Sequence, residues 1–174
     1  LLRRLDPAGT APVDLRVVNL GLANAFTLPG GVVILTRGLL QEATGPDMVA
    51  GVLAHELAHV RHRHILAHMI RNAFLGAVWA VTLGDYSGLL VVDPDTAYNL
   101  ATLRHSRQAE SEADETALDM LVERGISADG LHAFFEKHAM DGEDATAWLS
   151  THPATGSRIR ALSSARPRRP TTPS

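Results

Sequence analysis

Two histidines and a glutamate in one short segment have the residue types and the spacing of a metal site. The segment from His55 to His59 reads HELAH and so has the pattern HExxH. Because residues four apart on a helix share a face, both imidazoles can bind one ion while Glu56 lies beside the remaining coordination position. The chain contains no cysteine, so histidines and carboxylates must hold any metal. The pattern predicts one Zn²⁺ per chain, with Glu56 as the base that activates a water molecule.

A different interpretation places the two histidines on the solvent-exposed face of an amphipathic helix. The residues between and around them argue against it, because they make the helix apolar on most sides. These apolar neighbours are Val52, Leu53, Leu57, Ala58 and Val60. We therefore expect both imidazoles to be buried, where each needs a polar partner or an ion.

A catalytic zinc site takes three protein ligands, so a third ligand must come from elsewhere in the chain. His62 is near in sequence, but on an unbroken helix it lies about 10 Å beyond His55. A zinc ion bonded at about 2 Å cannot span that separation. No glycine follows His59 to break the helix. We therefore expect His62 and His64 to lie on the helix surface.

Glu110 is the better candidate for the third ligand. It lies in the segment SRQAESEAD, in the middle of a predicted helix, and shares a helix face with Asp114 four residues later. Glu110 can give an oxygen to the zinc, while Asp114 can accept the free ring N–H of a ligating histidine. Alone, such a pair is typical of a solvated helix face. The HExxH segment upstream makes Glu110 the leading candidate.

Strands are predicted ahead of the HExxH segment. Residues 13–20 alternate apolar and polar side chains, and residues 32–36 form a short β-branched run. Pro29-Gly30-Gly31 between them has turn chemistry. We expect one small antiparallel sheet.

Helices are predicted over most of the remaining chain. Apolar residues recur at three- and four-residue intervals from Pro46 to at least His68. Capping residues and apolar stripes predict three further helices, from Asp95 to Gly125, from Ser127 through Phe135, and a short one from Thr155. The expected fold class is therefore α+β, mostly helical with one small sheet.

Length and charge limit the domain organisation and the partners. The chain has 174 residues, of which 45% are hydrophobic, enough for one core over residues 1–164, and the Pro-rich tail at 165–174 is expected to be disordered. Because the sequence begins at Leu1 without a leader, we expect a domain cut from a longer precursor.

Sixteen basic and nineteen acidic residues give a net charge of −3. Without a broad basic field, nucleic acid is not an expected partner.

An uncharged apolar stretch occupies residues 73–84, and a second apolar run lies at 89–92. A membrane-spanning helix needs about 20 apolar residues, whereas only 13 separate Arg71 from Asp85. A buried helix or a hydrophobic lid is therefore favoured over a membrane-contacting segment.

Several ordered motifs together resemble a known family. The HExxH segment is followed by Arg63-His64, then by S-R-x-x-E-x-x-A-D ending at Asp114, then by His152-Pro153 and Arg158. Ahead of them, residues 24–31 read NAFTLPGG. The combination, which covers most of the chain, resembles the zinc metallopeptidases of the HtpX, BepA, mitochondrial OMA and CAAX prenyl protease type, and so implies a zincin-like fold.

The resemblance implies a role for each matching residue. His55, His59 and Glu110 would bind zinc, Glu56 would be the base, and Asp114 would support a ligand. His152 would stabilise the transition state near the metal, although a plain turn residue before Pro153 is an equal alternative. Arg158 would orient His152 or the substrate, and a surface arginine is its alternative.

The implied activity is zinc-dependent endopeptidase cleavage in protein quality control at the cell envelope. Unfolded or envelope proteins would be the substrates, bound as an added strand along Asn24, Ala25 and Phe26 or along Val32 to Leu35. Simple support of the fold is the alternative role for this hairpin. The parent protein would be membrane-anchored or periplasmic, with membrane association through flanking segments.

Two other functions stay open on the sequence. One is a latent zinc-binding, chaperone-like module in which His152 occupies the open zinc position and hydrolysis is weak. The other is metal-assisted hydrolysis of an amide bond in a small substrate.

Overall fold

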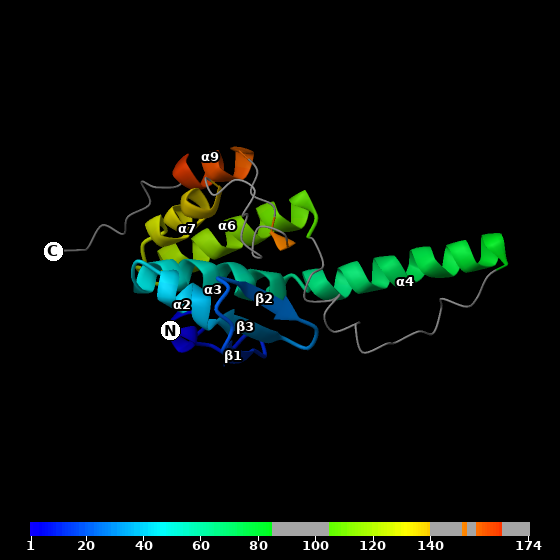
Figure 1. Ribbon diagram of the computed structural model, residues 1–174, viewed down its shortest axis with the longest axis horizontal. Coiled ribbons are helices and arrows are strands. Elements are labelled where there is room, and N and C mark those ends of the chain that lie inside the picture. The colour runs from blue at the N-terminus through cyan, green and yellow to red at the C-terminus, as the bar shows by residue number, and fades with distance from the viewer. Residues whose placement is uncertain (85–104, 140–150, 153–155, 165–174) are drawn as a thin grey trace.

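The computed structural model describes residues 1–84, 105–139, 151–152 and 156–164 (Figure 1). Its central element is helix α3 (Pro46–Arg61), which begins behind Gly45 with Pro46 in the first turn. Proline is favoured there because its missing N–H has no partner in the first turn. Every residue of α3 from Ala50 to His59 is buried, as expected for a helix that is apolar on most sides.

A three-stranded sheet packs against one side of α3. Strands β2 (Ala25–Leu28) and β3 (Val32–Thr36) form an antiparallel hairpin, and β1 (Asp14–Val18) pairs with the other edge of β3 in parallel. The order is β1-β3-β2, so the sheet is mixed rather than wholly antiparallel. This arrangement arises because the chain passes from β1 to the far edge of the sheet before turning back as β3.

The hairpin turn depends on its glycines. Gly30 and Gly31 have φ values of +85° and +82°, a backbone conformation that L side chains rarely adopt. At Gly31 an added Cβ would also collide with the carbonyl oxygen of Pro12. The predicted turn chemistry therefore matches the structure.

Helices cover the opposite side of α3. Figure 1 shows α3 between the sheet and a helical layer, in which α6 and α7 lie on α3 and α9 lies beyond them. The bounds of these helices are α6 Arg107–Glu123, α7 Asp129–Ala139 and α9 Gly156–Ser164. Two short helices complete the described fold, α1 (Leu2–Leu5) and α2 (Arg37–Glu42).

One hydrophobic core joins these layers around α3. Its largest fully buried apolar side chains come from α1, α2, α3, α6 and α7. They include Leu5, Leu39, Leu53, Leu57, Leu121, Leu131, Phe134 and Phe135. The architecture confirms the expected α+β, zincin-like class, mostly helical with one small sheet.

The predicted helix over residues 46–68 is two helices in the structure. α3 ends at Arg61, and α4 (His64–Leu83) begins after Arg63, whose φ of +54° is the only positive value at a non-glycine residue in the described chain. Thus an arginine in the left-handed conformation breaks the helix, although no glycine is present. The expectation of an unbroken helix is wrong.

The start of α6 also differs from the prediction. Ser106 caps it, since the Ser106 hydroxyl accepts a hydrogen bond from the Ala109 N–H at 3.1 Å. Glu110 therefore lies in the first turn and not in the middle of the helix. The predicted cap at Asp95 lies outside the described residues, as does the predicted tail at 165–174. Gly125, with φ +62°, follows the end of α6 as predicted.

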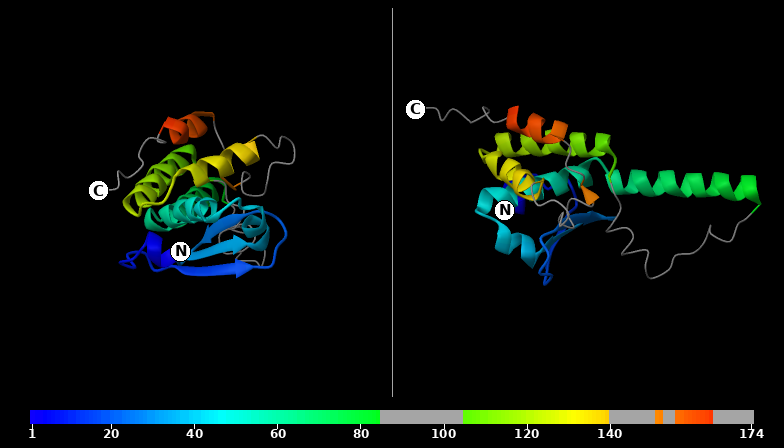
Figure 2. Two further views of the ribbon diagram at one scale, coloured as in Figure 1. Left: turned by 90° about the vertical axis from the view of Figure 1, so that its left-hand side faces the viewer. Right: turned by 45° about the horizontal axis from the view of Figure 1, so that its top comes forward.

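Helix α4 projects from the body of the molecule, as Figure 1 and the right-hand view of Figure 2 show. Most of its large apolar side chains are exposed, including Phe74 at 67% and Val81 at 69%. The expectation of a buried helix is therefore wrong for the described part of 73–92. Within the described residues, α4 alone has the length and apolar composition to cross a membrane, a test that some soluble core helices also pass.

Candidate metal centre

The buried middle of α3 holds three of the residues singled out in the sequence. His55 and Glu56 are completely buried, and His59 is 1% exposed. Because they lie one and four residues apart on a helix, all three side chains lie near one another. Burying polar groups in this way is costly unless they are paired or bind a metal. A partner from another element is therefore required.

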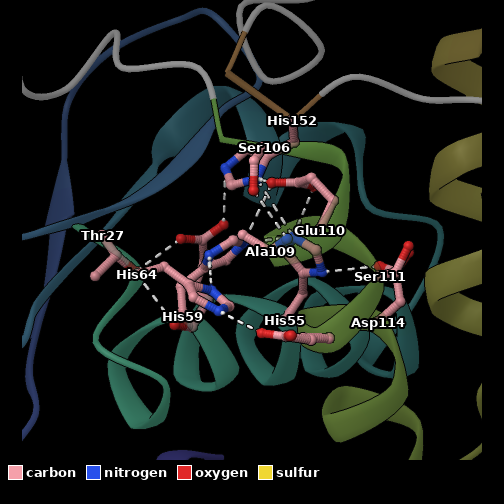
Figure 3. Close-up of polar contacts among 12 residues, drawn as sticks. Thr27, His55, His59, His64, Ser106, Ala109, Glu110, Ser111, Asp114 and His152 are labelled. Atoms are coloured by element: carbon pink, nitrogen blue, oxygen red, sulfur yellow. Dashed lines mark hydrogen bonds and ion pairs between the residues drawn. The ribbon is translucent and has the colours of Figure 1, made fainter. Parts of the chain in front are cut away.

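Helix α6 supplies that partner, the buried side chain of Glu110 (Figure 3). One Glu110 carboxylate oxygen lies 3.5 Å from His55 Nε2, and the other lies 3.5 Å from His59 Nε2. The two Nε2 atoms are 3.1 Å apart. Ligand atoms bonded to a tetrahedral zinc at about 2.0–2.1 Å lie about 3.3 Å from one another. The structure thus brings the three predicted ligands together at a spacing that fits zinc.

His152 lies on the same centre. Its Nδ1 is 3.3 Å from His55 Nε2 and 3.1 Å from Glu110 Oε1, and its Nε2 is 3.3 Å from Glu56 Oε1. His55, His59, Glu110 and His152 can therefore each offer an atom to one ion. The Nδ1 atom of His152 therefore lies among the candidate ligand atoms, and its Nε2 atom lies beside Glu56, the proposed base.

Thr27 holds the carboxylate of Glu56 in place. The Thr27 hydroxyl, on the buried face of β2, donates to Glu56 Oε2 at 2.8 Å. The other oxygen, Oε1, faces His152. The sequence analysis missed Thr27, although its position two residues after Ala25 on the same strand face could have indicated it.

Asp114 and Arg158 support the centre from the far side. Asp114 Oδ1 lies 3.0 Å from His55 Nδ1, the ring nitrogen that faces away from the ligand cluster. Arg158 donates to both Asp114 oxygens, at 2.6 and 2.9 Å, and its Nη1 lies 2.7 Å from Glu110 Oε2. Arg158 is thus buried against the carboxylates of Asp114 and Glu110. The sequence predicted instead that it orients His152 or the substrate.

The electrostatics of the centre favour a cation. Burial lowers the pKa of His55, but the neighbouring carboxylates of Asp114 and Glu110 outweigh burial and raise it to about 9. Burial raises the pKa of Glu110, but His152 and His55 outweigh burial and hold it far below its usual range. Glu110 is therefore an anion.

The pKa of His59 lies well below the usual value for histidine, because burial and the neighbouring His55 both lower it. A neutral imidazole is the form that binds a metal. Two imidazole nitrogens and a carboxylate, without thiolates, form a ligand set that suits zinc.

His62 and His64 do not both lie on a helix surface. His62 is exposed, and its Nε2 is 2.7 Å from the Thr116 hydroxyl. His64, however, is 9% exposed, and its Nδ1 lies 2.9 Å from His59 Nδ1. The break at Arg63 turns His64 back toward the centre, so the surface prediction is wrong for His64.

His105 is a further residue that the sequence analysis missed. Its ring lies 4.0 Å from that of His59 and 5.1 Å from that of His152, measured between centroids. Its backbone N–H donates to the Thr151 carbonyl at 3.1 Å, which fixes the residue before His152. Burial and His152 lower the pKa of His105 to about 3, so it packs as a neutral ring. No periodicity or motif marks this position in the sequence.

The residues expected to bind substrate lie on the hairpin beside α3. Ala25 is buried and pairs with Leu35, while Asn24 and Phe26 are half-buried. β3 is the central strand, flanked by β1 and β2, so the alternative edge at Val32 to Leu35 is not free for an added strand. Within the described residues β2 pairs only with β3, so its other edge is the candidate.

Comparison with known proteins agrees with this geometry. Residues 7–166 match the model of peptidase family M48. The metalloprotease YcaL of Escherichia coli is 35% identical over 156 residues, which are 87% of this chain and 61% of YcaL. The mitochondrial metalloendopeptidase OMA1 of Saccharomyces cerevisiae is 33% identical over 86% of this chain and 46% of OMA1.

A third relative is the putative beta-barrel assembly-enhancing protease of Vibrio cholerae, 29% identical over 78% of this chain and 31% of that protein. The chain thus spans less than two thirds of the length of each of these relatives. The family model covers nearly the whole chain, and its match includes every residue of the candidate centre. This chain therefore belongs to peptidase family M48.

Proposed function

We propose that this domain is a zinc-dependent endopeptidase in which His55, His59 and Glu110 bind the ion and Glu56 is the general base. The observation that carries the proposal is the buried cluster of two Nε2 atoms and one carboxylate, spaced 3.1–3.5 Å apart with Glu56 beside it. A cluster of this composition and spacing has the ligand set of a catalytic zinc site.

When bound, zinc lowers the pKa of a coordinated water toward about 7 and polarises the scissile carbonyl. Glu56 accepts a proton from the attacking water and returns it to the leaving amine. Thr27 holds one oxygen of Glu56, and the other oxygen, which faces His152, takes part in this transfer. His152 donates from its ring to the developing oxyanion, a contribution on the order of 10²- to 10³-fold in rate.

The substrate binds as an added strand along the edge of β2 that faces away from β3, an edge with which no other described strand pairs. Main-chain hydrogen bonds would give tolerance of many sequences. Asn24 lies at the start of this edge, and its buried Oδ1 accepts no hydrogen bond from the described residues, so it can accept one from a substrate N–H. Asn24, Ala25 and Phe26 are accordingly the proposed substrate-binding residues.

Unfolded or envelope proteins are the proposed substrates, in protein quality control. The Vibrio cholerae relative is named a putative beta-barrel assembly-enhancing protease, and this name supports an envelope role. An endopeptidase that binds main chain is suited to unfolded segments, because these expose an extended backbone.

Cleavage of casein with and without a chelator tests the proposal. We expect chelator-sensitive cleavage by the wild type, and a loss of about 10²- to 10⁴-fold in Glu56→Gln with zinc retained. The exposed Glu115→Gln is the matched control. Absence of chelator-sensitive cleavage contradicts the endopeptidase assignment and leaves a small amide substrate as the alternative.

A second candidate function is a latent zinc-binding module, and one contact favours it. His152 Nδ1 lies as close to His55 Nε2 and Glu110 as the ligands lie to one another, so it can occupy the fourth coordination position. His152→Ala distinguishes the two roles. An oxyanion donor predicts slower cleavage by this variant, whereas a blocking ligand predicts faster cleavage.

We propose that the parent protein lies at the cell envelope and that α4 contacts the membrane. Exposed apolar side chains along α4, with few charges, support this location. Phe74→Asp with Val81→Asp should reduce sedimentation with phospholipid vesicles, whereas Leu22→Asp, at an exposed leucine on the body, should not. If the Phe74→Asp/Val81→Asp variant binds vesicles as well as the wild type does, membrane contact through α4 is contradicted.

A further inference from the structure

His59 has a partner on each of its two ring nitrogens. Its Nε2 faces Glu110 and His55, and its Nδ1 lies 2.9 Å from His64 Nδ1 (Figure 3). On the other side of the His64 ring, Nε2 lies 3.3 Å from Glu112 Oε2. A continuous path therefore runs from the candidate ion site through His59 and His64 to a carboxylate.

The donor and acceptor roles along this path follow from the proposed function, on which this inference rests. If His59 binds zinc through Nε2, its Nδ1 carries the ring proton. His64 Nδ1 must then accept that hydrogen bond, so the His64 proton lies on Nε2 and points to Glu112. We propose that His64, held by Glu112, is the positioning residue for the metal ligand His59.

The same arrangement supports the other ligating histidine. His55 Nδ1 faces Asp114, and Arg158 holds Asp114. Each histidine of the HExxH segment thus has a hydrogen-bond partner on the nitrogen that faces away from the ion, and each partner is held by a further charged side chain. Such outer partners fix the tautomer and the orientation of the ring.

The backbone is bent in a way that builds this contact. On a continued α3, His64 would lie about 7.5 Å along the axis from His59 and on a different face. Arg63 adopts φ +54°, ends α3 and starts α4, and so returns His64 to His59. A non-glycine residue in this conformation persists only where its surroundings enforce it, and such residues cluster at functional sites.

A second metal site is the competing interpretation, because His62, His64 and Glu112 can each offer an atom within 4.8 Å of the others. The ring geometry argues against it. The imidazole planes of His62 and His64 are stacked at 9°, whereas an ion must lie in the plane of each ring that binds it. An ion on His64 Nε2 would also move the His64 proton to Nδ1, against the N–H of His59.

Zinc affinity tests the proposal directly. We expect His64→Ala to weaken zinc binding about 10- to 100-fold in competition with a chromophoric chelator. His64→Gln, whose amide oxygen can accept from His59, should retain more affinity than His64→Ala. His62→Ala is the matched control and should stay within about twofold of wild type, because His62 is exposed and bonds to Thr116.

Chemical rescue separates positioning from a loss of folding. A cavity of about 270 Å³ lies beside His64, lined also by His62, His105 and Glu112. Added imidazole should therefore restore zinc affinity to His64→Ala and leave the wild type unchanged. If His64→Ala does not fold, Glu112→Gln replaces it, with an expected loss of zinc affinity and no loss in Glu115→Gln.

The outcomes are distinguishable from those of the proposed function. A wild type that binds no zinc overturns the proposed function together with this inference. If the wild type binds one zinc ion and the folded His64→Ala variant binds zinc with equal affinity, this inference alone is overturned. A wild type with two zinc ions, one of them lost in His62→Ala, assigns His64 to a second ion and also overturns it.

Discussion

At the residue scale, the orientation of His55 depends on Asp114. The Asp114 carboxylate is buried, faces His55 Nδ1 at 3.0 Å, and accepts two hydrogen bonds from Arg158. Burial raises the pKa of Asp114, but Arg158 and His55 outweigh it and lower the pKa below its usual value. Asp114 is therefore ionised, which increases the basicity of the imidazole it faces.

Asp114→Asn should weaken zinc binding about 10- to 100-fold, because the amide cannot match the carboxylate as an acceptor. The measurement is zinc competition against a chelator, at a pH where wild type is saturated. Glu115→Gln, an exposed neighbour on the same helix, is the control. Equal zinc affinity in Asp114→Asn and wild type would show that Asp114 does not support the ligand.

The residues with fixed spacing were the ones that the sequence could predict. His55, Glu56 and His59 are related by helix geometry alone, and the structure brings them together with Glu110. Thr27, His64 and His105 reach the centre through tertiary contacts, so their spacing from the HExxH segment did not predict their place there. His64 in particular depends on a backbone conformation at Arg63 that the sequence pattern does not encode.

At the element scale, the close approach of α3 and α7 fixes the helical layer. Gly51, in the middle of α3, lies against Leu131, and a Cβ there would come within 2.7 Å of the Leu131 backbone nitrogen. A Cβ at Gly130 on α7 would come even closer to the backbone of Asp47. One glycine from each helix, Gly51 on α3 and Gly130 on α7, therefore allows the two backbones to approach closely.

Gly51→Ala should destabilise the domain by roughly 1–3 kcal/mol, because the added methyl group overpacks the contact. Thermal unfolding should show this as a lower Tm, by about 2–4 °C for each kcal/mol. Gly21→Ala, where an added Cβ meets nothing within 4 Å, is the control. An unchanged Tm in Gly51→Ala would mean that α7 does not pack on α3 as described.

Element types were predictable from periodicity, whereas their ends and partners were not. The apolar repeat continues from α3 into α4, so it gave no sign of the break at Arg63. Likewise, an alternating strand does not specify its neighbour. The short turn at Pro29-Gly30-Gly31 fixed β2 against β3, but the parallel pairing of β1 needed the whole fold.

At the scale of the whole molecule, Asp6 ties the N-terminal segment to the end of α3. Its carboxylate accepts hydrogen bonds from the Thr10 hydroxyl at 2.9 Å and the Ala11 N–H at 3.1 Å. Arg61, the last residue of α3, donates to it at 3.4 Å. Burial raises the pKa of Asp6, but these contacts together outweigh burial and lower the pKa below its usual value.

Asp6→Asn should lower the free energy of unfolding by about 1–3 kcal/mol at pH 7. Because the pKa of Asp6 is depressed in the folded state, its contribution is present above the unfolded pKa of about 3.9 and is lost as the pH falls through the folded pKa. Urea unfolding of both proteins at pH 7 and pH 3 checks this. The difference between them should shrink at pH 3, and a constant difference would contradict the role of the carboxylate.

The central claim is that a carboxylate from α6 completes a zinc site begun by two histidines of α3. Zinc content after dialysis, measured by mass spectrometry for wild type and Glu110→Ala, tests it most directly. We predict one zinc per chain in wild type and far less than one in a folded Glu110→Ala. Stoichiometric zinc retained in that variant would contradict the account.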